Sequence, residues 1–257
     1  MPLLEIKGLS HQFDGLKAVS DFNLRLYEGE LVGLIGPNGA GKTTVFNLVT
    51  GIHRPTIGTI RLNGINLVGL EPNRITALGI ARTFQNIHLF NDMTVLDNVR
   101  VAFYRSFRYG LASALLRTGG FLREDDRITR QALELLEALD LKDRYNSLAR
   151  HLPYGDQRRL EMARALATNP KLLLLDEPAA GMNPQEVDEL ARLIHWVRER
   201  FRVTIFLIEH QMRMVMNLCQ RVKVMHFGET IAEGSPEEIR KDPRVIEAYL
   251  GKGESLA

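Results

Sequence analysis

The feature that most constrains this chain is a glycine-rich loop at residues 36–43, which reads G-P-N-G-A-G-K-T. An apolar run at 30–35 predicts a strand before it, and residues 44–50 predict a helix after it. Glycines let the backbone turn tightly and point successive N–H groups at one anion, and the helix adds the positive end of its dipole. We therefore expect the phosphates of a nucleoside triphosphate to contact Gly36, Pro37, Asn38, Gly39, Ala40, Gly41, Lys42, Thr43 and Thr44.

Two side chains of this loop have specific expected roles. Lys42 supplies a cation for the outer phosphates, and the Thr43 hydroxyl is placed to bind Mg²⁺. The alternative interpretation is a glycine turn with an incidental lysine, and the strand and helix on either side argue against it.

Composition restricts the possible partners and compartments. A length of 257 residues allows one large α/β domain or two small ones, and a net charge of +2 is too mild to indicate a nucleic-acid partner. The single cysteine, Cys219, excludes an intrachain disulfide, and we expect it to be a small buried residue. We see neither a signal peptide nor a run of about 20 apolar residues, so any membrane role is expected to come through a partner.

Strands and helices alternate along much of the chain. The apolar runs at 172–175 and 203–208 predict strands buried on both faces of a parallel sheet. Residues 95–166 instead have helical periodicity, as in the spacing of Ala132, Leu135, Leu136 and Leu139. The pattern predicts an α/β fold whose parallel sheet is interrupted by a helical block.

Two adjacent acids, Asp176 and Glu177, end the predicted strand at 172–175. Ligands bind at this edge of a parallel sheet. The pair suits a division of labour in which Asp176 holds Mg²⁺ and Glu177 activates an attacking water. The alternative is a solvated acidic turn.

Together, these motifs resemble the nucleotide-binding subunits of ABC transporters, and the resemblance covers essentially the whole chain. It implies a P-loop NTPase (RecA-like) core with an antiparallel β subdomain and an inserted α-helical subdomain, ATP and Mg²⁺ as cofactors, and ATP hydrolysis. The single ABC domain of residues 1–257 would comprise a core with the β subdomain at 1–87 and 162–257. The helical subdomain would occupy 88–161, including an insertion at 102–126.

The resemblance adds three site residues. Gln85 in R-T-F-Q-N resembles the family's glutamine at the junction with the helical subdomain, where it would bind the metal. His210 in L-I-E-H resembles the switch histidine that contacts the γ-phosphate, although a lone histidine there could simply cap the sheet. Phe13 in H-Q-F-D-G resembles the aromatic that stacks on adenine, although a phenylalanine is more often part of a core.

One motif departs from the family pattern. The usual L-S-G-G-Q signature appears at residues 152–156 as L-P-Y-G-D, in which Tyr154 and Gly155 are expected to contact ATP held by an opposing subunit. Pro153 replaces a hydroxyl donor and removes a backbone N–H, and Asp156 places a negative charge near phosphate. From Pro153 we expect the ATP site that this signature completes to be the weaker of the two in a dimer.

Longer phrases resemble the Liv-type ATP-binding subunits of branched-chain amino acid importers. They include F-N-L-V-T-G at 46–51, G-I-A-R-T-F-Q-N at 79–86, M-T-V-L-D-N-V at 93–99, D-E-P-A-A-G at 176–181 and R-V-I-E-A-Y-L-G at 244–251. This resemblance implies a head-to-tail dimer, a heterodimer in the cell, on the cytoplasmic face of the inner membrane. Two integral-membrane permeases and, indirectly, a periplasmic solute-binding protein would be its partners.

Three questions stay open at this level. A non-transport ABC-type ATPase, a nucleotide-dependent switch or assembly factor, and a small-molecule kinase are the alternatives to a transporter subunit. The transported solute is inferred only from likeness. The insertion at 102–126, with its aromatic and arginine side chains, could face lipid or the membrane subunit, or it could pack on the helical subdomain.

Overall fold

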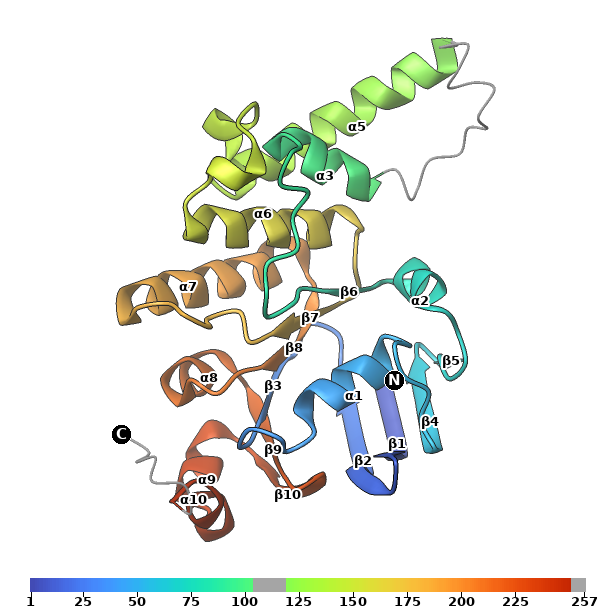
Figure 1. Cartoon of the computed structure of the whole chain (residues 1–257), viewed down its shortest axis with the longest axis vertical. Coiled ribbons are helices and arrows are strands. Elements are labelled where there is room, and N and C mark those ends of the chain that lie inside the picture. The colour runs from blue at the N-terminus through green and yellow to red at the C-terminus, as the bar shows by residue number, and fades with distance from the viewer. Residues whose placement is uncertain (104–118, 251–257) are drawn as a thin grey trace. The chain divides into compact units, whose positions relative to one another are not determined.

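The computed structural model describes residues 1–103 and 119–250, which belong to two compact units (Figure 1). The first unit comprises Met1–Gln85 and Lys171–Ala257, and the second comprises Asn86–Pro170. Each unit is described separately below.

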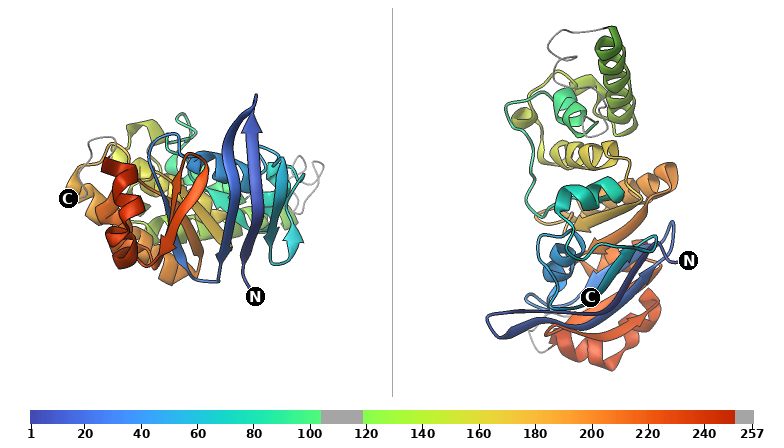
Figure 2. Two further views of the ribbon diagram at one scale, coloured as in Figure 1. Left: turned by 90° about the horizontal axis from the view of Figure 1, so that it is seen from below. Right: turned by 90° about the vertical axis from the view of Figure 1, so that its right-hand side faces the viewer.

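An antiparallel sheet begins the first unit. Its order is β2-β1-β4-β5, with β1 at Leu4–Phe13, β2 at Leu16–Leu26, β4 at Ile57–Leu62 and β5 at Ile65–Asn66. Figure 2 shows β1 and β2 as a long hairpin. Along β1 the side chains of Leu4, Ile6 and Leu9 are buried, so one face of this sheet contributes to a core.

A second sheet of six strands forms the centre of the same unit. Its order is β10-β9-β3-β8-β7-β6, with β10 at Glu229–Gly234, β9 at Arg221–His226, β3 at Leu31–Ile35, β8 at Thr204–Ile208, β7 at Leu172–Asp176 and β6 at Ile80–Arg82. Strands β9 to β6 are parallel, and β10 is antiparallel to β9. Every residue of β3, β7 and β8 is buried, which confirms the parallel sheet predicted from the apolar runs.

Helix α1 (Lys42–Val49) packs between the two sheets (Figure 1). Its buried side chains Val45 and Phe46 share one core with residues of β1, β2, β3 and β8. The phosphate loop is therefore anchored by a buried helix on one side and a buried strand on the other. The remaining helices described in this unit are α2 (Pro72–Leu78), α7 (Pro184–Phe201), α8 (Met212–Leu218), α9 (Pro236–Lys241) and α10 (Pro243–Leu250).

The second unit is helical, as the periodicity predicted. Helices α3 (Val95–Phe103), α5 (Gly119–Ala138) and α6 (Tyr154–Ala167) pack on one another, with 3-10 turns η2 (Lys142–Arg144) and η3 (Ala149–His151) between α5 and α6. The four apolar residues that predicted this helical block are all buried. Six residues that carried the interpretation of the insertion lie outside the described residues: Tyr104, Arg105, Phe107, Arg108, Tyr109 and Arg117. Within the described ranges, none of the helices combines the length and apolar character that crossing a bilayer requires.

Candidate functional site

The phosphate loop connects β3 to α1 and is packed too tightly for side chains at two of its glycines. Gly36 has φ 149° and Gly41 has φ 101°. A Cβ added to Gly36 would lie 2.1 Å from the carbonyl oxygen of Met225, and one added to Gly41 would lie 2.3 Å from that of Ala18. The loop is thus pressed against β9 and β2, and only glycine fits at these two positions.

Lys42 lies inside the loop rather than in solvent. Its side-chain Nζ donates hydrogen bonds to the carbonyl oxygens of Gly36 at 2.7 Å and Pro37 at 3.0 Å, and the residue is only 5% exposed. Among the described residues, no side chain caps the N-terminus of α1, and the first turn of that helix contains no acid. The positive end of the helix dipole and the lysine cation therefore act together on one small volume, which favours an anion.

A cleft of about 1250 Å³ opens above this loop. All nine expected phosphate-loop residues, 36–44, line it, together with Gln85, Glu177 and His210. The structure thus brings together residues from four separate segments of the chain. The other lining residues are Leu16, Lys17, Ala18, Gln211, Met212, Arg213, Phe227, Ala248 and Tyr249.

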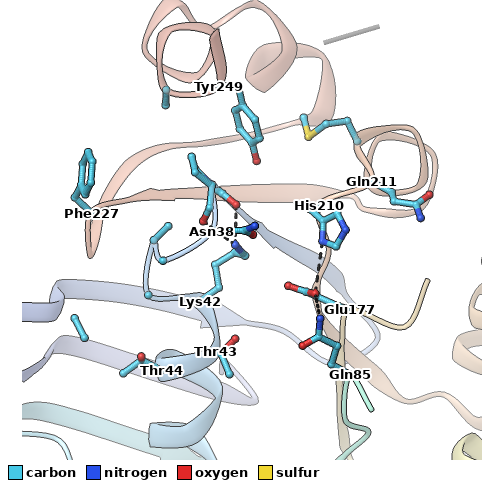
Figure 3. Close-up of a pocket in the computed structure, with 18 of the residues that line it drawn as sticks. Asn38, Lys42, Thr43, Thr44, Gln85, Glu177, His210, Gln211, Phe227 and Tyr249 are labelled. Carbon is cyan, nitrogen blue, oxygen red and sulfur yellow. Dashed lines mark hydrogen bonds and ion pairs between the residues drawn. The ribbon is translucent and has the colours of Figure 1, made fainter. Parts of the chain in front are cut away.

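Glu177 lies between Gln85 and His210 in this cleft (Figure 3). Gln85 Nε2 donates a hydrogen bond to Glu177 Oε2 at 2.7 Å, and His210 Nδ1 is 3.6 Å from the same oxygen. The backbone of Glu177 has φ 46°, and its N–H donates to the carbonyl oxygen of Ile208 at 2.9 Å. This strained, left-handed conformation turns the chain sharply after β7 and is the kind of outlier that clusters at functional sites.

Asp176, one residue earlier, is in a different environment. Its carboxylate is not among the groups that line the cleft, and its Oδ2 accepts a hydrogen bond from Arg82 Nη2 at 2.6 Å. The two side chains are 7% and 6% exposed. The other terminal nitrogen of Arg82 donates to Asn47 Oδ1 at 2.8 Å, and the guanidinium lies 5.5 Å from the ring centre of Phe46. Arg82 therefore ties the end of β7 to helix α1.

Phe13 is at the end of β1 and is not among the residues that line the cleft, but it pairs across the β1–β2 hairpin with Leu16, which does line it. Its ring is in edge contact with His11 at 4.5 Å and with His53 at 5.2 Å between centroids, and the residue is 41% exposed. Burial, followed by the charge of His53, lowers the pKa of His11 below its ordinary value.

Tyr154 and Gly155 belong to the second unit, where α6 begins at Tyr154 directly after Pro153. The Tyr154 hydroxyl accepts a hydrogen bond from Arg158 Nη2 at 2.9 Å. Asp156 forms an ion pair with Arg144 at 3.3 Å, which offsets the negative charge that Asp156 brings to this helix terminus.

Sequence reasoning missed two aromatic residues of the cleft. Phe227 is at the turn between β9 and β10, with φ 46° and an exposure of 79%. Tyr249 is on α10 and is 6% exposed. An exposed aromatic in the F-G turn was a usable signal for Phe227, because that position of a tight hairpin favours asparagine or glycine. Nothing local to residue 249 indicated that α10 folds back to the phosphate loop.

The donors expected for Mg²⁺ are the Thr43 hydroxyl, the Gln85 amide oxygen and the Asp176 carboxylate. All three are oxygen ligands, which is the chemistry that Mg²⁺ requires. Among the described residues there is no group of three or more His, Cys, Asp or Glu side chains that could hold a metal on its own. Of the three, Thr43 and Gln85 line the cleft, whereas the Asp176 carboxylate does not line it and accepts a hydrogen bond from Arg82.

Comparison with known proteins gives concordant matches. The family model for ABC transporters matches residues 19–180, and the model for branched-chain amino acid ATP-binding cassette transporters matches residues 229–255. The chain is 49% identical to the high-affinity branched-chain amino acid transport ATP-binding protein LivG of Escherichia coli (strain K12), over 98% of each protein. It is 46% identical to the corresponding protein BraF of Pseudomonas aeruginosa, again over 98% of each. Among solved structures, the ADP conformation of MJ1267, an ATP-binding cassette of an ABC transporter, superposes with a TM-score of 0.85 at 29% identity, covering 98% of this chain and all of that one.

Proposed function

The chain belongs to the ABC transporter family of ATP-binding proteins, and on that premise we propose that it hydrolyses ATP in an importer of branched-chain amino acids. The observation that carries the hydrolytic part is the convergence of Glu177, Gln85 and His210 beside the phosphate loop. In this proposal Glu177 activates the attacking water. Gln85 and His210 hold the carboxylate from two sides, and His210 contacts the γ-phosphate.

Residues 36–44 hold the triphosphate, with Lys42 on the outer phosphates. In support, the loop presents an uncapped helix terminus and a buried lysine to one cleft. Thr43, Gln85 and Asp176 hold Mg²⁺, which when bound neutralises charge on the phosphate oxygens. Phe13 retains its proposed role as the adenine contact, which requires the adenine to reach beyond the lining residues of the cleft toward the end of β1.

The working form of the protein is a head-to-tail pair with a second, different ATP-binding subunit. Tyr154 and Gly155 at the start of α6 contact the nucleotide held by that second subunit. The pair binds two integral-membrane permeases at the cytoplasmic face of the inner membrane, and a periplasmic binding protein delivers the solute. High identity to LivG and BraF over nearly the whole chain supports this assembly.

Leucine, isoleucine and valine are the proposed solutes. The match of residues 229–255 to the branched-chain amino acid family supports this choice, because it is independent of the motifs common to all ABC proteins.

The test uses the complex purified with its membrane and ATPase partners and reconstituted in liposomes. Glu177→Gln should leave ATP binding intact and reduce hydrolysis by at least about 100-fold, the scale of a lost general base. Near-normal turnover in this variant would exclude Glu177 as the base. Binding protein loaded with leucine should stimulate the wild-type ATPase, and stimulation only by chemically unrelated solutes would refute the proposed substrate class.

A further inference from the structure

Glu209, the residue directly after β8, carries a fully buried carboxylate with an exposure of 0%. Its Oε1 accepts a hydrogen bond from the backbone N–H of Ala179 at 2.8 Å. Its Oε2 accepts from the N–H groups of His210 at 2.9 Å and Gln211 at 3.1 Å. A buried carboxylate is costly unless it is well hydrogen-bonded, and here the donors come from the main chains of two different loops.

These two loops follow neighbouring parallel strands, because Asp176 of β7 pairs with Ile208 of β8. Further bonds join them beside Glu209. The Glu177 N–H donates to the Ile208 carbonyl oxygen at 2.9 Å, and Gln211 Nε2 donates to the Ala179 carbonyl oxygen at 3.1 Å. The carboxylate therefore sits in the middle of a set of bonds that joins residues 177–179 to residues 208–211.

The position of the set matters because each loop carries a residue of the proposed chemistry. Glu177 is two residues before Ala179, and His210 directly follows Glu209. Their side chains meet in the cleft, where His210 Nδ1 is 3.6 Å from Glu177 Oε2 (Figure 3). The left-handed backbone of Glu177 is a conformation that persists only where surrounding bonds hold it.

We propose that Glu209 is a positioning residue that fixes Glu177 relative to His210 by fastening the two loops together. This inference rests on the proposed function, since it assigns Glu209 no contact with nucleotide. Glu209 is absent from the residues that line the cleft, whereas the phosphate loop lines it directly. Loss of the hydrogen bonds that Glu209 accepts should therefore reduce kcat much more than the affinity for nucleotide.

Glu209→Gln is a sharp perturbation because it keeps the volume and changes only the hydrogen-bonding capacity. A glutamine has one acceptor oxygen and one donor amide, so its NH₂ group must face a backbone N–H. Either the bond from Ala179 or the bonds from His210 and Gln211 are then lost. Glu199→Gln on α7 is the matched control, because its side chain is 62% exposed and pairs with His195 on the same helix.

In the reconstituted complex, Glu209→Gln should reduce kcat by about 10- to 100-fold, the scale of a small displacement of catalytic groups. The affinity for ATP, measured by equilibrium binding, should change less than about 3-fold, and Glu199→Gln should match the wild type in both. In a His210→Ala background, Glu209→Gln should reduce kcat by less than about a further 3-fold, because both changes disturb the same placement of Glu177 relative to His210.

An unchanged kcat, or equal losses in kcat and ATP affinity, would overturn the proposal. It would also be overturned if Glu209→Gln reduced kcat by the same factor in the His210→Ala background as in the wild type. If Glu209→Gln does not fold, Gln211→Ala removes the side-chain bond to Ala179, together with a side chain that lines the cleft. This variant should reduce kcat by a smaller factor, again with a change of less than about 3-fold in ATP affinity. A wild-type complex without ATPase activity would refute the proposed function instead, so the two failures are distinguishable.

Discussion

Replacing Arg82 with methionine should destabilise the fold mainly by leaving a buried carboxylate unpaired, with a smaller loss from its hydrogen bond to Asn47. The substitution leaves the Asp176 carboxylate, only 7% exposed, without the cation that now lies 2.6 Å away. Removing one partner of a buried ion pair costs about 3–5 kcal/mol, because the remaining charge is neither solvated nor paired. In a chain of this size, 1 kcal/mol shifts Tm by about 2–4 °C. The expected fall in Tm is therefore about 6–20 °C.

Thermal unfolding of the purified chain without nucleotide, followed by circular dichroism, measures this effect. The double variant Arg82→Met/Asp176→Asn should recover most of the loss, because it removes the stranded charge. Lys142→Met is the control, since its pair with Glu137 is exposed (52% and 60%) and such pairs contribute less than about 1 kcal/mol. A fall in Tm of less than about 2 °C for Arg82→Met, or no recovery in the double variant, would refute the reasoning.

Further predictions concern Gly41, Pro153 and Cys219. Gly41→Ala should weaken ATP binding by at least about 10-fold, measured by equilibrium titration, because its Cβ would lie 2.3 Å from the Ala18 carbonyl oxygen and force the loop to move. Pro153→Ser should raise ATPase turnover of the complex by about 2- to 10-fold, the value of one restored hydrogen bond, and unchanged turnover would count against a weak signature. Burial, with a smaller effect from the Glu209 charge, raises the pKa of the Cys219 thiol to about 12, so native protein at pH 8 should resist maleimide labelling that the unfolded chain accepts rapidly. The thiol of the unfolded chain ionises near its ordinary pKa of 9.0, whereas the folded one stays protonated up to about 12. The free energy of unfolding should therefore fall as the pH rises from about 9 to 12, and Cys219→Ala should not show this part of the fall.

The parallel sheet and the phosphate loop could be predicted because their signals are local. The apolar runs at 172–175 and 203–208 each require burial on both faces, and the glycines at 36 and 41 mark a loop with no room for side chains. Contacts between residues on neighbouring strands are harder to predict from the sequence. Arg82 and Asp176 are 94 positions apart, and nothing in either segment indicates that β6 and β7 are neighbours.

Glu209 carries a sequence signal that points to a buried polar role. It directly follows the apolar run V-T-I-F-L-I, and a charged residue at this position must either reach solvent or be hydrogen-bonded inside the protein. The sequence does not specify which of the two occurs, because the N–H of Ala179 is brought to Glu209 only by the turn of the chain that follows β7. Phe227 and Tyr249 illustrate the same limit, since the cleft that they line is assembled from segments that meet only in the folded chain.

The residues proposed to bind the nucleotide phosphates and those proposed to cleave them are positioned by different strands. The loop at 36–41 is held in shape by contacts with β2 and β9, through the carbonyl oxygens of Ala18 and Met225. The groups proposed for cleavage instead depend on β6, β7 and β8, whose ends position Gln85, Glu177 and His210. The phosphate loop lies against β2 of the antiparallel sheet and β9 of the six-stranded sheet, whereas Glu177 and His210 follow β7 and β8. We therefore expect a change in the bonds between the β7 and β8 loops to alter turnover while the phosphate loop keeps its shape.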